Sequence, residues 1–369
     1  MSLMQNNEYK QEHKCLGAKN ESDHGGMSPS SEKSKGENMM KSVPLTILVF
    51  SLAFFSVFAP SAVMALPRGE AVEAIADRLV AEQAPDGSWP GEEGYTGSIV
   101  AGLINAYEAT QKAEYKTAAE LGASFILDSA AGNFYGDEAY ALVRLTEVTG
   151  DPNYADAVRD FYDWLDTYTY EYIRGYEETD RSNAVFYVAH HAVAAYKVEA
   201  ADAGIWRQGL IQYLSRIDDD LAYYPVMSLG VATWALAQTG PMDDTMIDPF
   251  GLIGEEYWWN VKLSDLPDML ASHQVLADAG DYAGSFYHRF DHTPAGEGYE
   301  ASGYTEDTIY GLIGLIAADN AGWDFDEQIL GAKEVLCWPV TSDGIVYEHI
   351  WSGGAVYYTY GGEVLQVIP

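Results

Sequence analysis

The chain has 369 residues, of which 48% are hydrophobic and 13% aromatic, enough for one large domain or two ordinary ones. Its formal net charge is −36, and the whole excess lies after residue 65, where 50 acids stand against 14 bases. Such a surface repels phosphate backbones and anionic lipids, which excludes nucleic acid as a partner and disfavours polyanionic sugars. We interpret the acidity as a solubility feature or as adaptation to salt.

The N-terminal region reads as a targeting segment. Residues 1–38 are polar and aperiodic, which predicts a disordered leader or a misassigned start. Residues 39–65 carry Lys41, an apolar run and small residues ending at Ala65, the pattern of a cleaved secretory signal peptide. An uncleaved signal that anchors the chain to a membrane is the alternative. Residues 66–369 are expected to form a single domain that is secreted or otherwise extracytoplasmic.

After residue 65 the apolar residues recur with a helical period, and no convincing strand pattern is present. Every second predicted helix begins at a small or polar residue that follows an aromatic-bearing loop, about 39 to 49 residues after the previous one, with an insertion before Gly303. These helices are the more apolar ones, as an inner layer requires. The predicted helices are 70–83, 96–110, 113–127, 138–148, 154–173, 182–196, 204–217, 225–238, 264–276, 303–318, 326–336 and 353–367.

Twelve helices with this alternation predict an all-α protein, an (α/α)6 toroid of paired helices. An open α-helical solenoid is the alternative. In a toroid, the loops that lead into the inner helices meet at one end of the ring, and helix N-termini favour anions there. Functional residues are therefore sought in those loops.

One motif carries a family resemblance. Gln83, Gly87 and Trp89, with Asp86 beside the glycine, form the pattern Gln-x-x-x-Gly-x-Trp. It resembles the QW repeat of the squalene-cyclase and prenyltransferase toroid superfamily, and the helix pairing extends the likeness over residues 68–369. The resemblance implies that glutamine and tryptophan tie a helix end to the next loop. Residues 132–134 and 284–286 are degenerate copies in which phenylalanine replaces tryptophan.

The chemistry of that superfamily does not follow from the motif. The class II cyclases carry Asp-x-Asp-Asp, and the nearest string here, residues 217–220, has isoleucine in place of the first aspartate. Cys337 has no Asp and His companions of the kind that a zinc prenyltransferase needs. A terpenoid cyclase-like enzyme therefore remains only a second alternative. Secreted toroids are also common among polysaccharide lyases and glycosidases, an analogy of fold alone.

The richest loop precedes the predicted helix 303–318. His288 and His292 are candidate acid and base, with Asp291 beside them, and Arg289 and Tyr304 are candidate substrate-binding residues. The alternative is a polar loop without catalysis.

A second cluster opens the predicted helix 182–196. Asn183, Tyr187 and His190 lie about one turn apart, next to Arg181. Such a set suits β-elimination, in which a cation or amide neutralises a uronate carboxylate while Tyr or His removes a proton. The alternative is a polar helix face satisfied by its neighbours.

Acids at the starts of inner helices form the third candidate. Asp137 and Glu306 could supply the two carboxyl groups that glycoside hydrolysis needs. The ordinary explanation is first-turn acids that complement the helix dipole. Trp351 is a candidate platform for a sugar ring, and core filling is the alternative for most aromatics.

No cofactor is expected. The weaker alternatives are Ca²⁺ at Asp218–Asp220 or Asp243–Asp244, without the spacing of an EF-hand, and zinc at His288 and His292.

These observations favour a secreted toroid enzyme, a lyase or hydrolase, that acts on a carbohydrate polymer or oligosaccharide by acid–base catalysis in the centre of the ring. A non-catalytic toroid that binds a glycan or a protein is the alternative. The oligomeric state is left open.

Overall fold

The computed structural model describes residues 65–369, apart from residues 179, 221, 250–255, 277–281, 295, 297–299 and 351–352. The predicted leader, nearly all of the predicted signal, and Trp351 lie outside the described residues. Within the described part of the chain, none of the helices has the length and apolar character needed to cross a membrane.

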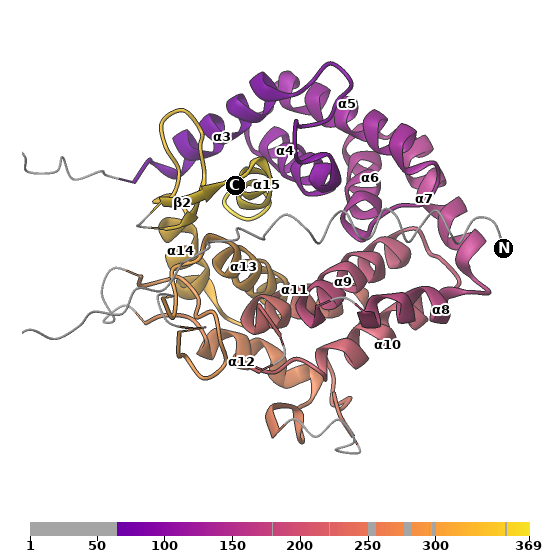
Figure 1. The fold of residues 1–369 in the computed structure, drawn as a ribbon, viewed down its shortest axis with the longest axis vertical. Helices are drawn as coiled ribbons and strands as arrows, with labels where there is room; N and C mark the ends of the chain where they lie inside the picture. Colours follow the sequence, from indigo (N-terminus) through magenta and orange to yellow (C-terminus); the bar gives the residue numbers. More distant parts are fainter. Residues whose placement is uncertain are drawn as a thin grey trace, which may run out of the picture. The chain divides into compact units, whose positions relative to one another are not determined.

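The described residues form an inner ring of six helices that follow one another in chain order (Figure 1). The last of them packs against the first, so the ring is closed and is not an open solenoid. The inner helices are α4 (Thr96–Thr110), α6 (Gly136–Thr149), α9 (Arg181–Lys197), α11 (Pro225–Thr239), α13 (Thr305–Asn320) and α15 (Tyr358–Leu365).

The inner helices run parallel. At one end, the backbone N–H of Tyr224, just before α11, donates to Oγ of Ser182 in the first turn of α9. At the other end, Asn105 of α4 donates to the carbonyl of Gln366, just after α15. The six helices therefore begin at one end, called here the N-terminal face, and finish at the opposite, C-terminal face.

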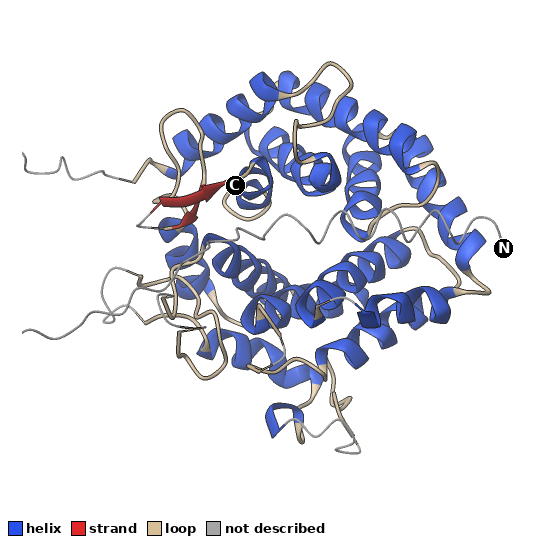
Figure 2. Ribbon diagram, viewed as in Figure 1, coloured by secondary structure: helices blue, strands red, loops and turns tan. Residues whose placement is uncertain are grey.

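An outer layer surrounds this ring, as Figure 2 shows, and outer and inner helices alternate along the chain. This confirms the predicted (α/α)6 toroid. The outer helices are α3 (Arg68–Glu82), α5 (Ala113–Ala130), α7 (Pro152–Leu165), α10 (Ala203–Leu214), α12 (Leu266–Ser272) and α14 (Asp326–Val335), with the short α8 (Thr169–Arg174) after α7.

The two layers differ in burial, as the sequence pattern predicts. Inner helix α11 buries 13 of its 15 residues, whereas outer helix α7 buries four of 14. Crowding on both sides requires small residues where inner helices meet. A Cβ on Gly102 of α4 would lie 2.1 Å from the carbonyl oxygen of Gly362 in α15, so this contact is made by backbone on backbone.

The predicted motif is a structural clasp between outer helices. Nε2 of Gln83, after α3, donates to the carbonyls of Gly87 and of Ala118 in α5, at 3.0 and 2.9 Å. The indole N–H of Trp89 donates to the carbonyl of Leu79 in α3 at 2.9 Å. These bonds give Gln83 and Trp89 the tying role that the resemblance implied.

Two further copies of the clasp are built on the same backbone turn. Gln274, after α12, donates through Nε2 to Gly284 and to Gln328 in α14, at 3.0 and 2.9 Å. The third copy, at Gly344, follows α14 and meets α3. Each clasp glycine has a positive φ, between 78° and 95°. The predicted copy at Gly132 has a positive φ but no atom where a Cβ would stand, so it is a turn without a clasp.

Several predicted helix boundaries are wrong. The predicted helix 154–173 is interrupted between Leu165 and Thr169, whose hydroxyl donates to Asp202 at 2.6 Å. The predicted helix 182–196 begins one residue earlier, at Arg181, because Asp180 is its N-cap. The carboxylate of Asp180 accepts the N–H groups of Ser182 and Asn183.

The predicted helix 353–367 begins too early. A two-stranded antiparallel hairpin, β1 (Tyr347–His349) and β2 (Gly353–Val356), precedes α15. Gly353 and Gly354 have φ values of 90° and 92°, which a right-handed helix cannot contain. The two glycines therefore belong to the hairpin and do not open the helix.

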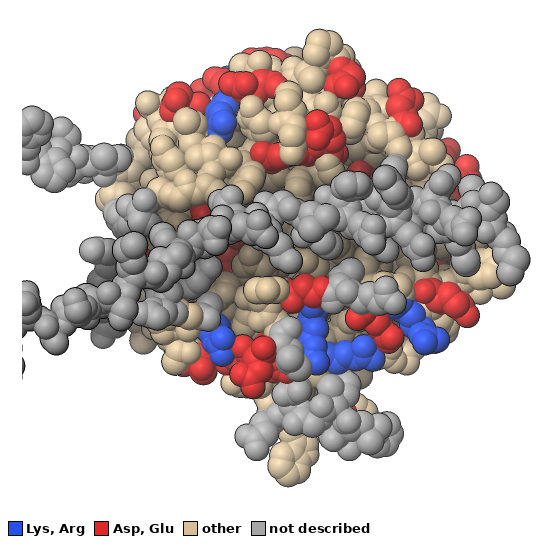
Figure 3. Space-filling view, in the orientation of Figure 1, with Lys and Arg blue, Asp and Glu red and all other residues tan. Residues whose placement is uncertain are grey.

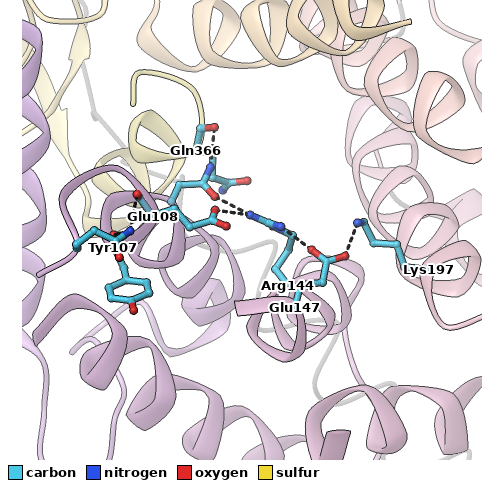
Figure 4. A network of polar contacts seen from close by, with 8 residues as sticks. Tyr107, Glu108, Arg144, Glu147, Lys197 and Gln366 are labelled. Carbon is cyan, nitrogen blue, oxygen red and sulfur yellow. Dashed lines mark hydrogen bonds and ion pairs between the residues drawn. The ribbon is translucent and has the colours of Figure 1, made fainter. Parts of the chain in front are cut away.

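A network of ion pairs joins three inner helices at the C-terminal face (Figure 4). Arg144 of α6 contacts Glu108 of α4 at 2.7 Å, and Lys197 of α9 contacts Glu147 of α6 at 2.6 Å. Cations near helix C-termini are favoured by the helix dipole. Acidic side chains are spread over the face drawn in Figure 3.

The clasp glycines generate a stability prediction. Replacing Gly87 with alanine adds a Cβ that would lie 2.2 Å from the carbonyl oxygen of Leu121, at a φ of 95°. We expect Gly87→Ala to lower the free energy of unfolding by about 3 kcal/mol, from left-handed strain plus overpacking. Gly91→Ala is the control, because Gly91 has a φ of 83° and open space around it. That control should lose only about 1 kcal/mol. Equal losses in urea denaturation would contradict the clasp.

Candidate functional site at the N-terminal face

Five acidic side chains, called here the acid cluster, gather at the N-terminal face. Asp137 lies in the first turn of α6, Glu306 and Asp307 lie in the first turn of α13, Glu348 lies in β1, and Glu363 lies in α15. The cluster is coupled electrostatically. The charges of Asp307 and Glu348 act on Glu306, and those of Glu306 and Asp137 act on Glu363.

Glu306 is the cluster member poised to hold and release a proton. Burial, together with the negative charges of Asp307 and Glu348 and against the opposing effect of His288, raises the pKa of Glu306 to about 7. The side chain keeps some contact with solvent even though it lies deep in the protein. A carboxyl group that exchanges its proton near neutral pH is suited to act as a general acid.

Asp307 is held by His288. Nδ1 of His288 lies 2.8 Å from Oδ2 of Asp307, and both side chains are buried. Burial alone would lower the pKa of His288, but the charge of Asp307 reverses the shift and raises it. Burial raises the pKa of Asp307 against the opposing effect of His288. The two groups therefore hold one proton between them, and His288 has its role through Asp307.

Glu363 is a buried carboxyl group with one occupied oxygen. Its Oε1 accepts the hydroxyl of Tyr310 at 2.7 Å. Burial, followed by the charge of Glu306, raises the pKa of Glu363 well above its usual range. Oε2 of Glu363 and Oδ1 of Asp307 are buried without a hydrogen-bond partner among the described residues. Unpaired buried oxygens are costly and are uncommon outside functional sites.

Asp137 is placed by the packing of α6 on α4. Its carboxylate lies over Gly97, where a Cβ would come within 2.6 Å of Oδ2. The charge of Asp137 reaches His190 of α9, whose Nδ1 lies 2.9 Å from the carbonyl of Phe186. Burial lowers the pKa of His190 even so. The buried imidazole of His190 lies 4.9 Å from the ring of Trp234 in α11.

The predicted β-elimination set on α9 is only partly assembled. Asn183 and Tyr187 are half-buried, and Tyr187 stacks on Tyr176 at 5.5 Å. Arg181 contacts Asp218 at 3.1 Å and donates to the carbonyl of Arg216. Because Arg181 is already paired with a carboxylate, it is poorly placed to neutralise a uronate.

The predicted loop cluster divides into two parts. His288 and Tyr304 belong to the N-terminal face, where their rings lie 5.2 Å apart. His292 is exposed, and its Nε2 contacts Nδ1 of His273 at 2.9 Å. Asp291 accepts from Thr293, and Nε of Arg289 lies 3.4 Å from Asp291. We therefore find no contact that joins His292, Asp291 or Arg289 to the acid cluster in the described residues.

The predicted calcium ligands are engaged in other bonds. Asp219 accepts the N–H groups of Phe290 and Asp291 and the hydroxyl of Tyr257, at 2.7 to 2.9 Å. Asp243 accepts from Thr245, and Asp244 pairs with Lys262. Across the described residues, no three His, Cys, Asp or Glu side chains are arranged to hold a metal ion.

The sequence pattern does not predict three residues of this site. Glu363 is a single acid in the predicted helix 353–367, which begins too early. Glu348 lies in the hairpin that was not predicted, and Tyr310 looked like core. The available signal for Glu363 was an acid facing an otherwise apolar inner helix.

Comparison with known proteins supports the fold. No protein-family model and no curated protein sequence matches the chain. Among solved structures, the GH76A alpha-1,6-mannanase of Salegentibacter sp. HEL1_6 matches with a TM-score of 0.53 at 14% identity, over 82% of this chain and 98% of that one. An inactive variant of it, with two consecutive aspartates replaced by asparagine, was solved with alpha-1,6-mannotriose and matches with a TM-score of 0.54 at 13% identity over the same shares.

The Lin0763 protein of Listeria innocua also matches, with a TM-score of 0.50 at 12% identity, over 82% of this chain and 96% of that one. At identities this low, likeness establishes architecture only. The kinship with terpenoid cyclases that the clasp suggests stays an expectation. What these structures establish is that the chain has the α/α-toroid fold they share.

Proposed function

We propose that this protein is a glycoside hydrolase, with the acid cluster as its active site. The observation that carries the proposal is Glu306, a deep-lying carboxyl group whose pKa is raised to about 7 at the N-terminal face. Glycoside hydrolysis needs one carboxylic acid to protonate the leaving oxygen and a second carboxylate as base or nucleophile. Glu306 is assigned as the acid and Asp137 as the second carboxylate.

The neighbouring residues support this division of roles. In the mannanase variants, two consecutive aspartates are replaced, and in this chain the consecutive acid pairs 137–138 and 306–307 lie in the first turns of the inner helices α6 and α13. Glu138 accepts the backbone N–H of Tyr135 and so caps α6. Asp307 is bound to His288. Asp137 and Glu306 are the members left for chemistry, and both act electrostatically on Tyr310.

The substrate is proposed to be a neutral carbohydrate, with alpha-1,6-mannan as the first choice to test because the structural neighbours are alpha-1,6-mannanases. The net charge of −36 opposes uronate polymers. Export rests on the signal-like residues 39–65 alone. A lyase remains the alternative reaction, and it would be recognised by unsaturated products in place of new reducing ends.

The first prediction concerns activity. Residues 66–369 should release reducing ends from a neutral glycan in a panel of alpha-1,6-mannan, dextran, xylan and β-glucan. Glu306→Gln should lower kcat/KM at least about a hundredfold, because a general acid contributes about 10² to 10⁴. Glu120→Gln is the control, since Glu120 is a partly exposed residue of outer helix α5 whose carboxylate pairs with Lys116 on the same helix. If Glu306→Gln keeps full activity, Glu306 is not the acid.

The second prediction concerns pH. A general acid works when protonated, so kcat/KM should fall as the pH rises through about 7, the pKa of Glu306. Glu348→Gln removes one of the negative charges that raise this pKa. It should therefore move the fall to lower pH while Glu120→Gln leaves the profile in place. A shift to higher pH would contradict the assignment.

The third prediction concerns stability. Because the pKa of Glu306 is raised from 4.5 to about 7, the folded chain holds a proton that the unfolded chain loses between these values. Stability therefore falls as the pH rises across that window. Glu306→Gln should raise the free energy of unfolding at pH 8, by at most about 3 kcal/mol and less after solvent screening, and change it little at pH 4. Urea denaturation at the two pH values measures the difference, and a loss at pH 8 would refute it.

A further inference from the structure

The residue immediately before an inner helix is nearly always a tyrosine. Of the six inner helices in the described part of the chain, five have tyrosine at the N-cap, and α9 has Asp180. Tyrosine makes up only 27 of the 369 residues, so chance does not account for this placement. The five residues, called here the tyrosine collar, are Tyr95, Tyr135, Tyr224, Tyr304 and Tyr357.

Capping does not explain the collar. Ser, Thr, Asp and Asn are the residues that cap helices, because a short side chain reaches back to the free N–H groups. Tyr95, Tyr224, Tyr304 and Tyr357 make no side-chain capping bond to their helices. For α15 the task falls to Glu92, which accepts the N–H groups of Tyr358 and Thr359 at 2.6 and 2.7 Å.

Core filling does not explain the collar either, apart from Tyr224, which packs against the core. Tyr95 and Tyr357 are each 44% exposed, and the other three are half-buried. Residues that break a local rule without a packing gain mark functional positions. The shared position of the five tyrosines, each at the start of a parallel inner helix, places them all at the N-terminal face.

The collar adjoins the acid cluster. Burial, with the charges of Glu306 and Asp307, raises the pKa of Tyr224 above its usual range. The ring of Tyr304 lies 5.2 Å from that of His288, the residue that holds Asp307. Aromatic faces therefore border the carboxyl groups assigned to bond cleavage.

We propose that the tyrosine collar is the substrate-binding rim of the hydrolase, whose rings stack on the faces of neutral sugar units while the acid cluster acts on one linkage. This inference rests on the proposed function. Helix axes in contact lie about 8 to 10 Å apart, so one sugar ring cannot reach more than two collar tyrosines. The rim is therefore built for an oligosaccharide or a polymer and not for a monosaccharide.

The charges at the N-terminal face favour an uncharged sugar. The acid cluster and Glu92 lie at the same face, and Arg181, beside the gap in the collar, is paired with Asp218. Carboxylates outnumber cations among the described residues of this face, so they would repel an anionic sugar. An uncharged chain meets no such repulsion.

The test is a binding measurement on the non-hydrolysing Glu306→Gln protein. Calorimetry with mannose and with alpha-1,6-mannotetraose, and affinity gels containing alpha-1,6-mannan, dextran, xylan, β-glucan or polygalacturonate, give affinity against length and charge. At least one neutral polymer should bind, and the tetraose should bind more tightly than mannose if mannan is the ligand. Tyr95→Ala and Tyr357→Ala should each weaken binding about two- to tenfold, while Tyr95→Phe and Tyr357→Phe keep most of it.

Tyr168→Ala is the matched control, because Tyr168 is 57% exposed but lies between α7 and α8 in the outer layer. Binding unchanged in Tyr95→Ala and Tyr357→Ala, preferred binding of polygalacturonate, or no binding of any neutral polymer would each overturn the collar. Binding through the collar without hydrolysis by the parent protein would refute the proposed function and leave the collar intact. Hydrolysis that is lost in Glu306→Gln but unchanged in Tyr95→Ala and Tyr357→Ala would refute the collar and leave the proposed function intact.

Discussion

Parallel packing of the inner helices is the constraint on which this structure depends. Six aligned helices bring six partial positive charges to one face and six partial negative charges to the other, an arrangement that repels itself. The chain offsets it with acids where the helices begin, among them Glu92 and Asp137, and with Arg144 and Lys197 where they end. The helix dipoles alone therefore favour carboxyl groups at the N-terminal face, whether or not those groups take part in catalysis.

The acid cluster goes beyond what the dipoles require. Dipole compensation is served by exposed or hydrogen-bonded acids, such as Glu138 in its capping position. Glu363 is instead buried and Glu306 is half-buried, and the pKa of each is raised first by desolvation and then by the negative charges of nearby carboxylates. The folded state is therefore less stable at neutral pH than an uncharged version would be. Proteins keep such costs mainly where function needs a group in an unfavourable ionisation state.

The architecture was predictable because the period of the helix starts is regular and because inner and outer helices differ in apolar content. The site was predictable in part, since first-turn acids identified Asp137 and Glu306 and loop composition identified His288. The rest depended on contacts between distant segments. Which of two histidines, His288 or His292, reaches Asp307 is decided by the path of the loop. The local signal of Glu363, an acid in an otherwise apolar helix, does not show which residues it meets.

The third clasp has a consequence for how the molecule assembles. Gly344 packs against Ala74 of α3, and α15 packs on α3 and α4. The last pair of helices, α14 and α15, therefore closes the ring against the first pair, α3 and α4. These contacts join residues more than 260 positions apart, and non-local contacts of this kind slow folding. Without α15, α3 and α4 would leave one side uncovered. Glu363 belongs to α15, so the acid cluster is complete only when α15 has closed the ring.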